Sequence, residues 1–235
     1  MVLSAPFFSA YLASDLFGKL IFWSLLILSI ASWVIMITKI KILKKIKINS
    51  KFFENIYKNR KENLLSFPLD GFSKKENPYF AIYSNTKEKT LDILNKNSYF
   101  SEKKDVYLSS ADIDLLGSGI DSSISNQTKR LEKNIFVLST VISLAPFLGL
   151  LGTVWGILVT FSSLQMQNFS ANSAVLSGLS MALATTVFGL VVAIPALVAY
   201  SFIKNKIKEY VKDLEHFSNS LLTTLEIQYR KVEKR

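Results

Sequence analysis

The stretch that decides the fold runs from residue 134 to residue 203 and reads NIFVLSTVISLAPFLGLLGTVWGILVTFSSLQMQNFSANSAVLSGLSMALATTVFGLVVAIPALVAYSFI. These seventy residues contain no Asp, Glu, Lys, Arg or His. Because about 20 apolar residues cross a hydrocarbon core as a helix, the stretch is long enough to cross a bilayer twice. Its polar, uncharged middle predicts a turn over residues 164–173, between membrane-spanning helices at 135–163 and 174–203.

A first membrane span is predicted over residues 20–38, which are also free of charge. Five lysines follow it closely, at Lys39, Lys41, Lys44, Lys45 and Lys47. A cleaved signal peptide would carry its basic residues before the apolar run, so this segment is expected to remain in the membrane. We expect residues 1–19 to lie outside the cytoplasm, with Ser14 and Asp15 capping the helix.

The basic residues are distributed unevenly around these spans. Of 28 Lys and Arg residues, one lies in 1–38, nineteen lie in 39–134 and eight lie in 204–235. This is the asymmetry of a membrane protein whose basic segments face the cytoplasm, and it argues against nucleic-acid binding. The chain has no cysteine and one histidine, His216, so we expect no metal site, no cofactor and no enzymatic activity.

Two segments next to the spans have helical periodicity. Apolar residues four or seven apart run from Ile113 to Leu138 and predict a helix that enters the second span without a break. A similar pattern predicts an amphipathic helix over 204–235. Within the cytoplasmic region 39–134, the Asn- and Lys-rich segments 85–89 and 95–104 are expected to be loosely ordered. The predicted fold is an all-α integral membrane protein with three transmembrane helices, the last two extended into the cytoplasm.

Small and hydroxylated residues form one stripe on each of the later spans. On the second span these are Gly149, Gly152, Thr153, Gly156 and Thr160, and on the third they are Ala182, Thr186, Gly189, Ala193 and Ala196. Close helix packing explains such stripes, and a threonine there often bonds the carbonyl four residues back. A polar lining that faces a partner helix or a narrow wet path is the alternative, and periodicity by itself favours packing.

A hydroxyl can hold a water or relay a proton, but it does not titrate near pH 7. If this protein moves protons, the titrating carboxylate must therefore come from another chain. Asp15 could receive protons at the outer mouth, although helix capping is the favoured interpretation of this residue. Pro146 and Pro195 are expected to bend their helices and can act as hinges.

Two segments, APFLGLLGTVWGILVTF (145–161) and SGLSMALATTVFGLVVAIPALVAY (177–200), resemble the MotA/TolQ/ExbB proton-channel family. The first span, with SIASWVIMITKIKIL (29–43), is more similar to the TolQ branch than to ExbB. The resemblance implies a pentameric, homo-oligomeric bundle in the bacterial inner membrane. It also implies a TolR-like or ExbD-like partner with one span, whose aspartate carries the proton. Thr153 and Thr186 match the two pore threonines of the family.

The third span departs from the family pattern at Met181, where relatives usually have a glutamate. The resemblance implies a TolQ-like motor subunit that couples the proton motive force to the outer membrane and division through a TolA-like protein of the Tol–Pal system. One alternative is an ExbB-like energiser of TonB-dependent uptake. Another is a membrane scaffold that does not conduct, because methionine cannot exchange a proton.

Overall fold

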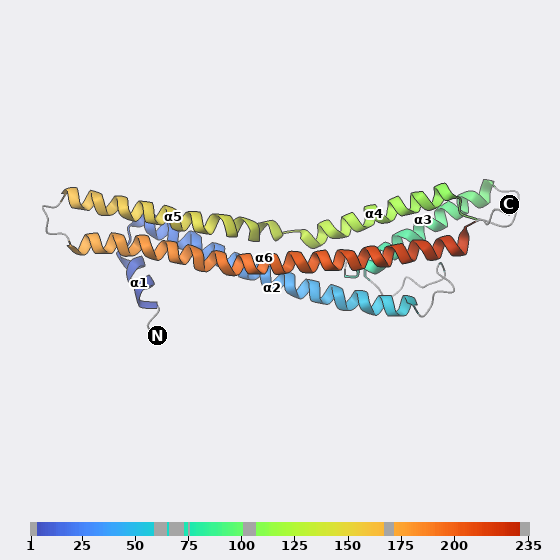
Figure 1. Ribbon diagram of the computed structural model, residues 1–235, viewed down its shortest axis with the longest axis horizontal. Coiled ribbons are helices and arrows are strands. Elements are labelled where there is room, and N and C mark those ends of the chain that lie inside the picture. Colours follow the sequence, from blue (N-terminus) through green and yellow to red (C-terminus); the bar gives the residue numbers. More distant parts are fainter. Residues whose placement is uncertain are drawn as a thin grey trace. The chain divides into compact units, whose positions relative to one another are not determined.

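The computed structural model describes residues 4–58, 65, 73–74, 76–100, 107–166 and 172–230. These residues form six helices, shown in chain order in Figure 1: α1 (Ser4–Ala13), α2 (Leu16–Lys58), α3 (Pro78–Phe100), α4 (Ser110–Glu132), α5 (Ile135–Met166) and α6 (Asn172–Tyr229). The helices are divided between two compact units. The first unit holds residues 1–39 and 134–203, and the second holds residues 40–133 and 204–235.

Three helices, α2, α5 and α6, are long and apolar enough to cross a membrane. Large apolar side chains cover their outer surfaces: Phe136, Phe147 and Leu176 are 69%, 68% and 68% exposed. Such exposure suits contact with lipid and would be unfavourable in water. The three predicted apolar helices are therefore confirmed. They extend beyond the predicted spans, since α2 begins at Leu16 and ends at Lys58.

The first unit packs around small residues. Its main cluster joins Ile21 and Leu25 of α2 to residues of the two later spans, which are Val141, Ala145, Val192, Ala193 and Ala196. Alanines at these contacts let the helix backbones approach closely, which is how helices associate in lipid. A second cluster brings Ala10 of α1, Phe22 of α2 and Met181 of α6 together.

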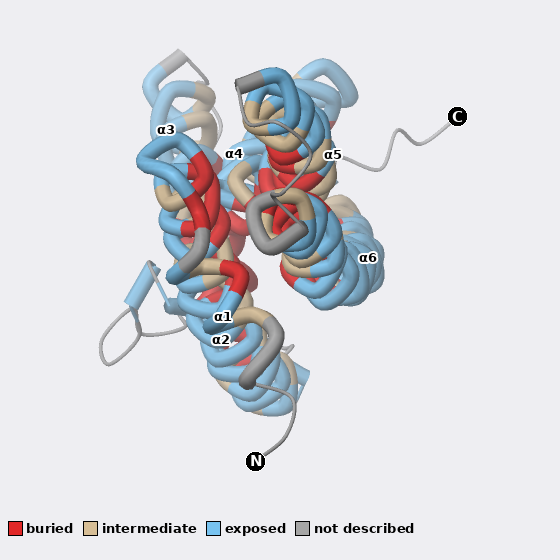
Figure 2. The backbone as a smooth tube through the Cα atoms, turned by 90° about the vertical axis from the view of Figure 1, so that its left-hand side faces the viewer, coloured by how far each residue is buried: buried red, intermediate tan, exposed pale blue. Residues whose placement is uncertain are grey.

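The second unit packs around aromatic rings. Phe53 of α2 contacts Phe80 and Tyr83 of α3 and Phe217 of α6, with ring centroids 5.7, 5.7 and 6.1 Å away. Along each helix the buried residues lie on one side and the exposed residues on the other (Figure 2). On α6 the buried side continues through Leu214, Leu221 and Leu225, as the predicted amphipathic pattern requires.

Helix α3 is absent from the sequence-based prediction. It includes residues 85–89 and 95–100, so the expectation of loose order there is wrong. Residues 101–104 lie outside the described part of the chain. The helix begins where the Asn77 side chain accepts a hydrogen bond from the Phe80 amide at 3.2 Å, and Pro78 occupies its first turn. Both residue types favour a helix start.

The predicted unbroken helix into the second span is also wrong. Helix α4 ends at Glu132 and α5 begins at Ile135, with Asn134 at a φ of 67° between them. Asparagine is one of the few residues that adopts this left-handed conformation readily. At the other end of α4, Ser109 caps the helix and forms a capping box with Asp112.

Both ends of the predicted turn over residues 164–173 are helical, because α5 continues to Met166 and α6 begins at Asn172. The intervening residues 167–171 lie outside the described part of the chain. Helix α6 runs without interruption from the third predicted span to Tyr229.

Candidate functional site

Glycines bring the backbones of α5 and α6 into direct contact. A Cβ on Gly156 would lie 2.8 Å from the Gly178 carbonyl oxygen and 2.9 Å from the Ala182 Cβ. A Cβ on Gly189 would lie 2.6 Å from the Ala145 carbonyl oxygen and 3.2 Å from the Gly149 Cα. Real Cβ atoms do not approach so closely, so only glycine fits. The small-residue stripes therefore pack α5 and α6 of this chain against each other.

Thr185 is a central residue of this interface that the sequence analysis missed. Its side chain is fully buried, and it fills the space that a Cβ on Gly152 would need. Its hydroxyl donates to the carbonyls of Met181 and Ala182, at 3.1 and 2.9 Å. The only signal in the sequence is that Thr185 and Thr186 are adjacent and so point to different sides of the helix.

Thr186 links the two helices by a hydrogen bond. Its hydroxyl lies 3.2 Å from the Gly149 carbonyl of α5 and 3.4 Å from the Ala182 carbonyl one turn back on α6. The second of these contacts is the predicted bond to the carbonyl four residues back. The first could not be predicted, because it depends on the rotation of α6 against α5.

Thr153 lies on α5 one helical turn after Gly149 and is half-exposed. Its hydroxyl donates to the Leu150 carbonyl at 2.6 Å, three residues back, and not to Gly149 as predicted. The structure therefore places Thr186 and the Gly149 carbonyl in contact, with Thr153 on the adjacent turn of α5. The prolines Pro146 and Pro195 lie inside α5 and α6, and both helices continue through them.

Asp15 is the single carboxylate in the sequence of the first unit. One oxygen, Oδ1, accepts a hydrogen bond from the Gly18 amide at 2.9 Å, which confirms that it caps α2. The other oxygen, Oδ2, accepts a hydrogen bond from the Trp155 indole of α5, also at 2.9 Å. Asp15 thus connects the start of the first span to the second span.

Met181 is a neighbour of this carboxylate. The methionine is 3% exposed, in the apolar cluster with Ala10 and Phe22. Its sulfur lies 2.8 Å from the point where a Cβ on Gly18 would stand, and Asp15 Oδ1 lies 3.0 Å from the same point. An acid at position 181 would therefore be buried beside Asp15.

The change Met181→Glu is expected to destabilise the first unit by about 3 kcal/mol or more, because it buries a second carboxylate next to an existing one. Thermal unfolding in detergent measures this loss. Met181→Leu, which keeps the volume and adds no charge, should cost less than about 1.5 kcal/mol. Adding Asp15→Asn to Met181→Glu should restore part of the stability. No recovery would show that the two positions are not coupled.

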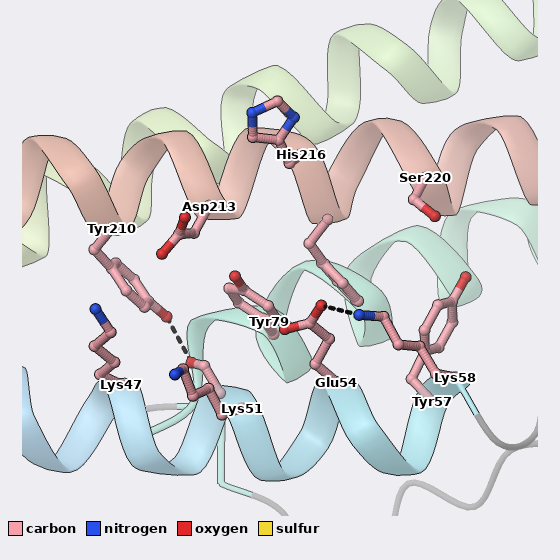
Figure 3. Close-up of a pocket in the computed structure, with 12 residues that line it drawn as sticks. Lys47, Lys51, Glu54, Tyr57, Lys58, Tyr79, Tyr210, Asp213, His216 and Ser220 are labelled. Atoms are coloured by element: carbon pink, nitrogen blue, oxygen red, sulfur yellow. Dashed lines mark hydrogen bonds and ion pairs between the residues drawn. The ribbon is translucent and has the colours of Figure 1, made fainter.

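The second unit contains a polar pocket of about 540 Å³ between α2 and α6. Within it, the hydroxyls of Ser50 and Tyr210 form a buried hydrogen bond of 2.6 Å. Lys58 pairs with Glu54 at 2.7 Å, and Tyr79 lies between Glu54 and Asp213 (Figure 3). Lysines and carboxylates both line the pocket, so neither sign of charge dominates it. Groups of three or more potential metal ligands are absent from the described residues.

Burial raises the pKa of Tyr79 and of Tyr210 above the ordinary value, and the nearby Asp213 carboxylate raises both further. Both phenols are therefore neutral at physiological pH. Ser50 is also close to Asn77, which caps α3, with 3.5 Å between their side-chain oxygens. The hydroxyl pair thus joins α2 and α6 next to the start of α3, and its role is structural.

The change Tyr210→Phe should destabilise the second unit by about 1–2 kcal/mol, because it removes one member of a buried hydrogen bond. Thermal unfolding in detergent is the measurement. Tyr107→Phe is a suitable control, since that side chain is 43% exposed. Equal effects of the two changes would contradict the assigned role of Tyr210.

Comparison with known proteins places these features in a family. Residues 94–216 match the MotA/TolQ/ExbB proton channel family. The Tol-Pal system protein TolQ of Haemophilus influenzae is 26% identical over 235 residues, which cover 97% of this chain and 97% of that protein. The biopolymer transport protein ExbB of Aquifex aeolicus is 41% identical over 87 residues, which cover 37% of this chain and 59% of that protein. TolQ of Pseudomonas aeruginosa is 40% identical over 79 residues, or 34% of each chain.

Proposed function

Because this chain belongs to the MotA/TolQ/ExbB proton channel family, we propose that it is the channel-forming subunit of a proton-driven motor in the bacterial inner membrane. In this proposal the N-terminus is periplasmic, and residues 39–134 and 204–235 are cytoplasmic. Five copies surround the single spans of a TolR-like partner. Proton flow moves that partner, which performs work at the outer membrane during envelope maintenance and division.

The observation that carries this proposal is the chemistry of the α5–α6 interface. Residues 134–203 contain hydroxyls but no group that titrates near neutral pH. The Thr186 hydroxyl donates to the Gly149 carbonyl, and the Thr153 hydroxyl lies on the next turn of α5. A channel formed by these helices can pass a proton along hydroxyls and water. It needs an acid from another chain to take the proton up and release it.

A TolQ-like role is favoured over an ExbB-like one by the extent of the match. The similarity to Haemophilus influenzae TolQ covers nearly the whole of both chains, whereas the similarity to Aquifex aeolicus ExbB covers 59% of the latter protein. The proposed downstream partner is accordingly TolA-like. A TonB-like partner belongs to the alternative role in nutrient uptake.

Reconstitution in liposomes tests the proposal. The complex of this chain with a TolR-like partner should acidify the lumen when a potassium diffusion potential is imposed. The same complex should be inactive when the intramembrane aspartate of the partner is replaced by asparagine. Flux with an ExbD-like partner in place of the TolR-like one would support the uptake role instead.

A scaffold that does not conduct is the second candidate, and the burial of Met181 favours it. That residue lies in an apolar cluster with Ala10 and Phe22, at the position where the resemblance to the family implies an acid. A complex that assembles correctly with its partner, as judged by its mass in detergent, and passes no protons would establish this second function and refute the motor.

A further inference from the structure

An apolar groove of about 590 Å³ lies on the first unit between α1, α2 and α6. Its walls include Phe8 and Tyr11 of α1, Phe22, Trp23 and Leu26 of α2, and Val191 of α6. It opens at the surface, where Phe8, Trp23 and Val191 are 63%, 55% and 56% exposed. The volume is within the range of pockets that hold small molecules.

Contacts among the aromatic rings fix the shape of the groove. Tyr11 packs edge-on against Phe22, with ring centroids 5.8 Å apart, and Phe22 packs against Phe188 at 6.2 Å. The Trp23 indole nitrogen donates to the Tyr11 hydroxyl at 3.2 Å, which joins α2 to α1. The groove is therefore preformed, and an occupant would not have to open it.

Lys19 is not one of the residues that line the groove, but its position on α2 places its charge near one end of it. It precedes Phe22, Trp23 and Leu26 by three, four and seven residues on α2. Residues at these spacings share one face of a helix, so Lys19 lies on the groove side, about one turn nearer the N-terminus. It is also the single basic residue in positions 1–38. A cation beside an apolar, aromatic groove matches the two parts of a phospholipid, an anionic phosphate and an acyl chain.

The polar atoms of Tyr11 and Trp23 support a phospholipid as the occupant of the groove. Tyrosine and tryptophan favour the boundary between hydrocarbon and lipid headgroups, where one end of the ring is apolar and the other is wet. Tyr11 and Trp23 direct their polar atoms toward each other at the groove. Asp15 lies four residues before Lys19, and its two carboxylate oxygens accept hydrogen bonds from the Gly18 amide and the Trp155 indole. An apolar transmembrane helix would fill the groove but would bring no anionic group to Lys19.

We propose that this groove binds a phospholipid, with an acyl chain between α1 and α6 and the phosphate beside Lys19. An anionic phospholipid is preferred over a zwitterionic one, because no second charge on its headgroup opposes Lys19. The site depends on the first unit lying in a bilayer and not on proton conduction, so its test is independent of the flux experiment.

Quenching of tryptophan fluorescence by brominated lipid tests this site, because Trp23 lines it. A variant that retains Trp23 alone (Trp33→Phe, Trp155→Phe) is compared with one that retains Trp33 alone (Trp23→Phe, Trp155→Phe). Trp33 is 50% exposed and reports on ordinary lipid contact. The probes are phosphatidylglycerol and phosphatidylcholine, each brominated in one acyl chain and diluted into unbrominated phosphatidylcholine.

Trp23 should reach half-quenching at a mole fraction of brominated phosphatidylglycerol about fivefold lower than Trp33, which is the preference expected of one basic side chain near an anionic lipid. Lys19→Gln should abolish this preference, whereas Lys41→Gln, which removes a charge outside the groove, should preserve it. Identical quenching of Trp23 and Trp33 by both lipids would overturn the proposal. Weaker quenching at Trp23 would overturn it too, because protein would then cover the groove.

A second measurement uses the unaltered chain and does not depend on the folding of any variant. Native mass spectrometry of the purified complex, after exchange into detergent, should show one anionic phospholipid retained per subunit. Lys19→Gln should lower that occupancy about fivefold, in line with the loss of one favourable charge. A complex that retains no phospholipid would refute the site.

Discussion

Replacing Thr186 by valine is expected to lower proton flux through the reconstituted complex by about a hundredfold, the scale of losing one positioned proton-transfer group. Valine has the shape of threonine, so the packing of α6 against α5 is preserved. What is lost is the hydroxyl that lies 3.2 Å from the Gly149 carbonyl. The rate of lumen acidification measures the effect, with complex assembly checked in detergent.

Two neighbouring changes serve as controls for Thr186→Val. Thr186→Ser keeps the hydroxyl and should retain most of the flux. Thr185→Val removes a buried hydroxyl whose acceptors, the carbonyls of Met181 and Ala182, belong to its own helix. It should therefore leave the flux nearly unchanged. An equal loss at positions 185 and 186 would contradict a specific role for the Thr186 hydroxyl.

Replacing Gly189 by alanine is expected to destabilise the first unit by about 2–3 kcal/mol, because overpacking a tight contact forces backbone shifts. The new Cβ would lie 2.6 Å from the Ala145 carbonyl oxygen, which is backbone and cannot rotate away. Thermal unfolding in detergent gives the loss. Proton flux should fall with it, since the same contact sets the distance between Thr186 and Gly149.

Gly117→Ala is a matched control on α4, because a Cβ there would meet a single side-chain atom, Leu222 Cδ2, at 3.6 Å. That is ordinary contact, and alanine is the better helix former by about 1 kcal/mol. The variant should be as stable as the parent chain or more stable. Similar destabilisation by both substitutions would show that the close approach of α5 and α6 is not the cause.

The three apolar helices could be predicted because a long stretch without charged residues forms few stable structures other than a membrane-spanning helix. The break at Asn134 could not, because the apolar spacing of Leu131, Ile135 and Leu138 continues across it as though the helix were intact. A single residue in the left-handed conformation ends a helix without interrupting the apolar spacing. The Lys-Asn pair at 133–134 was the available signal.

Helix α3 was missed for a different reason. Lys and Asn are frequent between Asn85 and Asn97, and this composition conceals the buried aromatic start at Tyr79, Phe80 and Tyr83. The Asn77-Pro78 pair that begins the helix was a usable signal. The contact between Asp15 and Trp155 had no signal of any kind, because the residues are 140 positions apart and meet only through the packing of α2 on α5.

The two threonines differ in how firmly their protons are held. Thr153 directs its proton to one carbonyl at 2.6 Å, whereas Thr186 shares its proton between two carbonyls at 3.2 and 3.4 Å. Hydrogen bonds weaken as they lengthen, so redirecting the Thr186 proton costs less free energy than redirecting that of Thr153. When Thr186 turns to another acceptor, it also frees the Gly149 carbonyl of α5. The contact between the Thr186 hydroxyl on α6 and the Gly149 carbonyl on α5 is therefore weak, and breaking it frees a donor on one helix and an acceptor on the other.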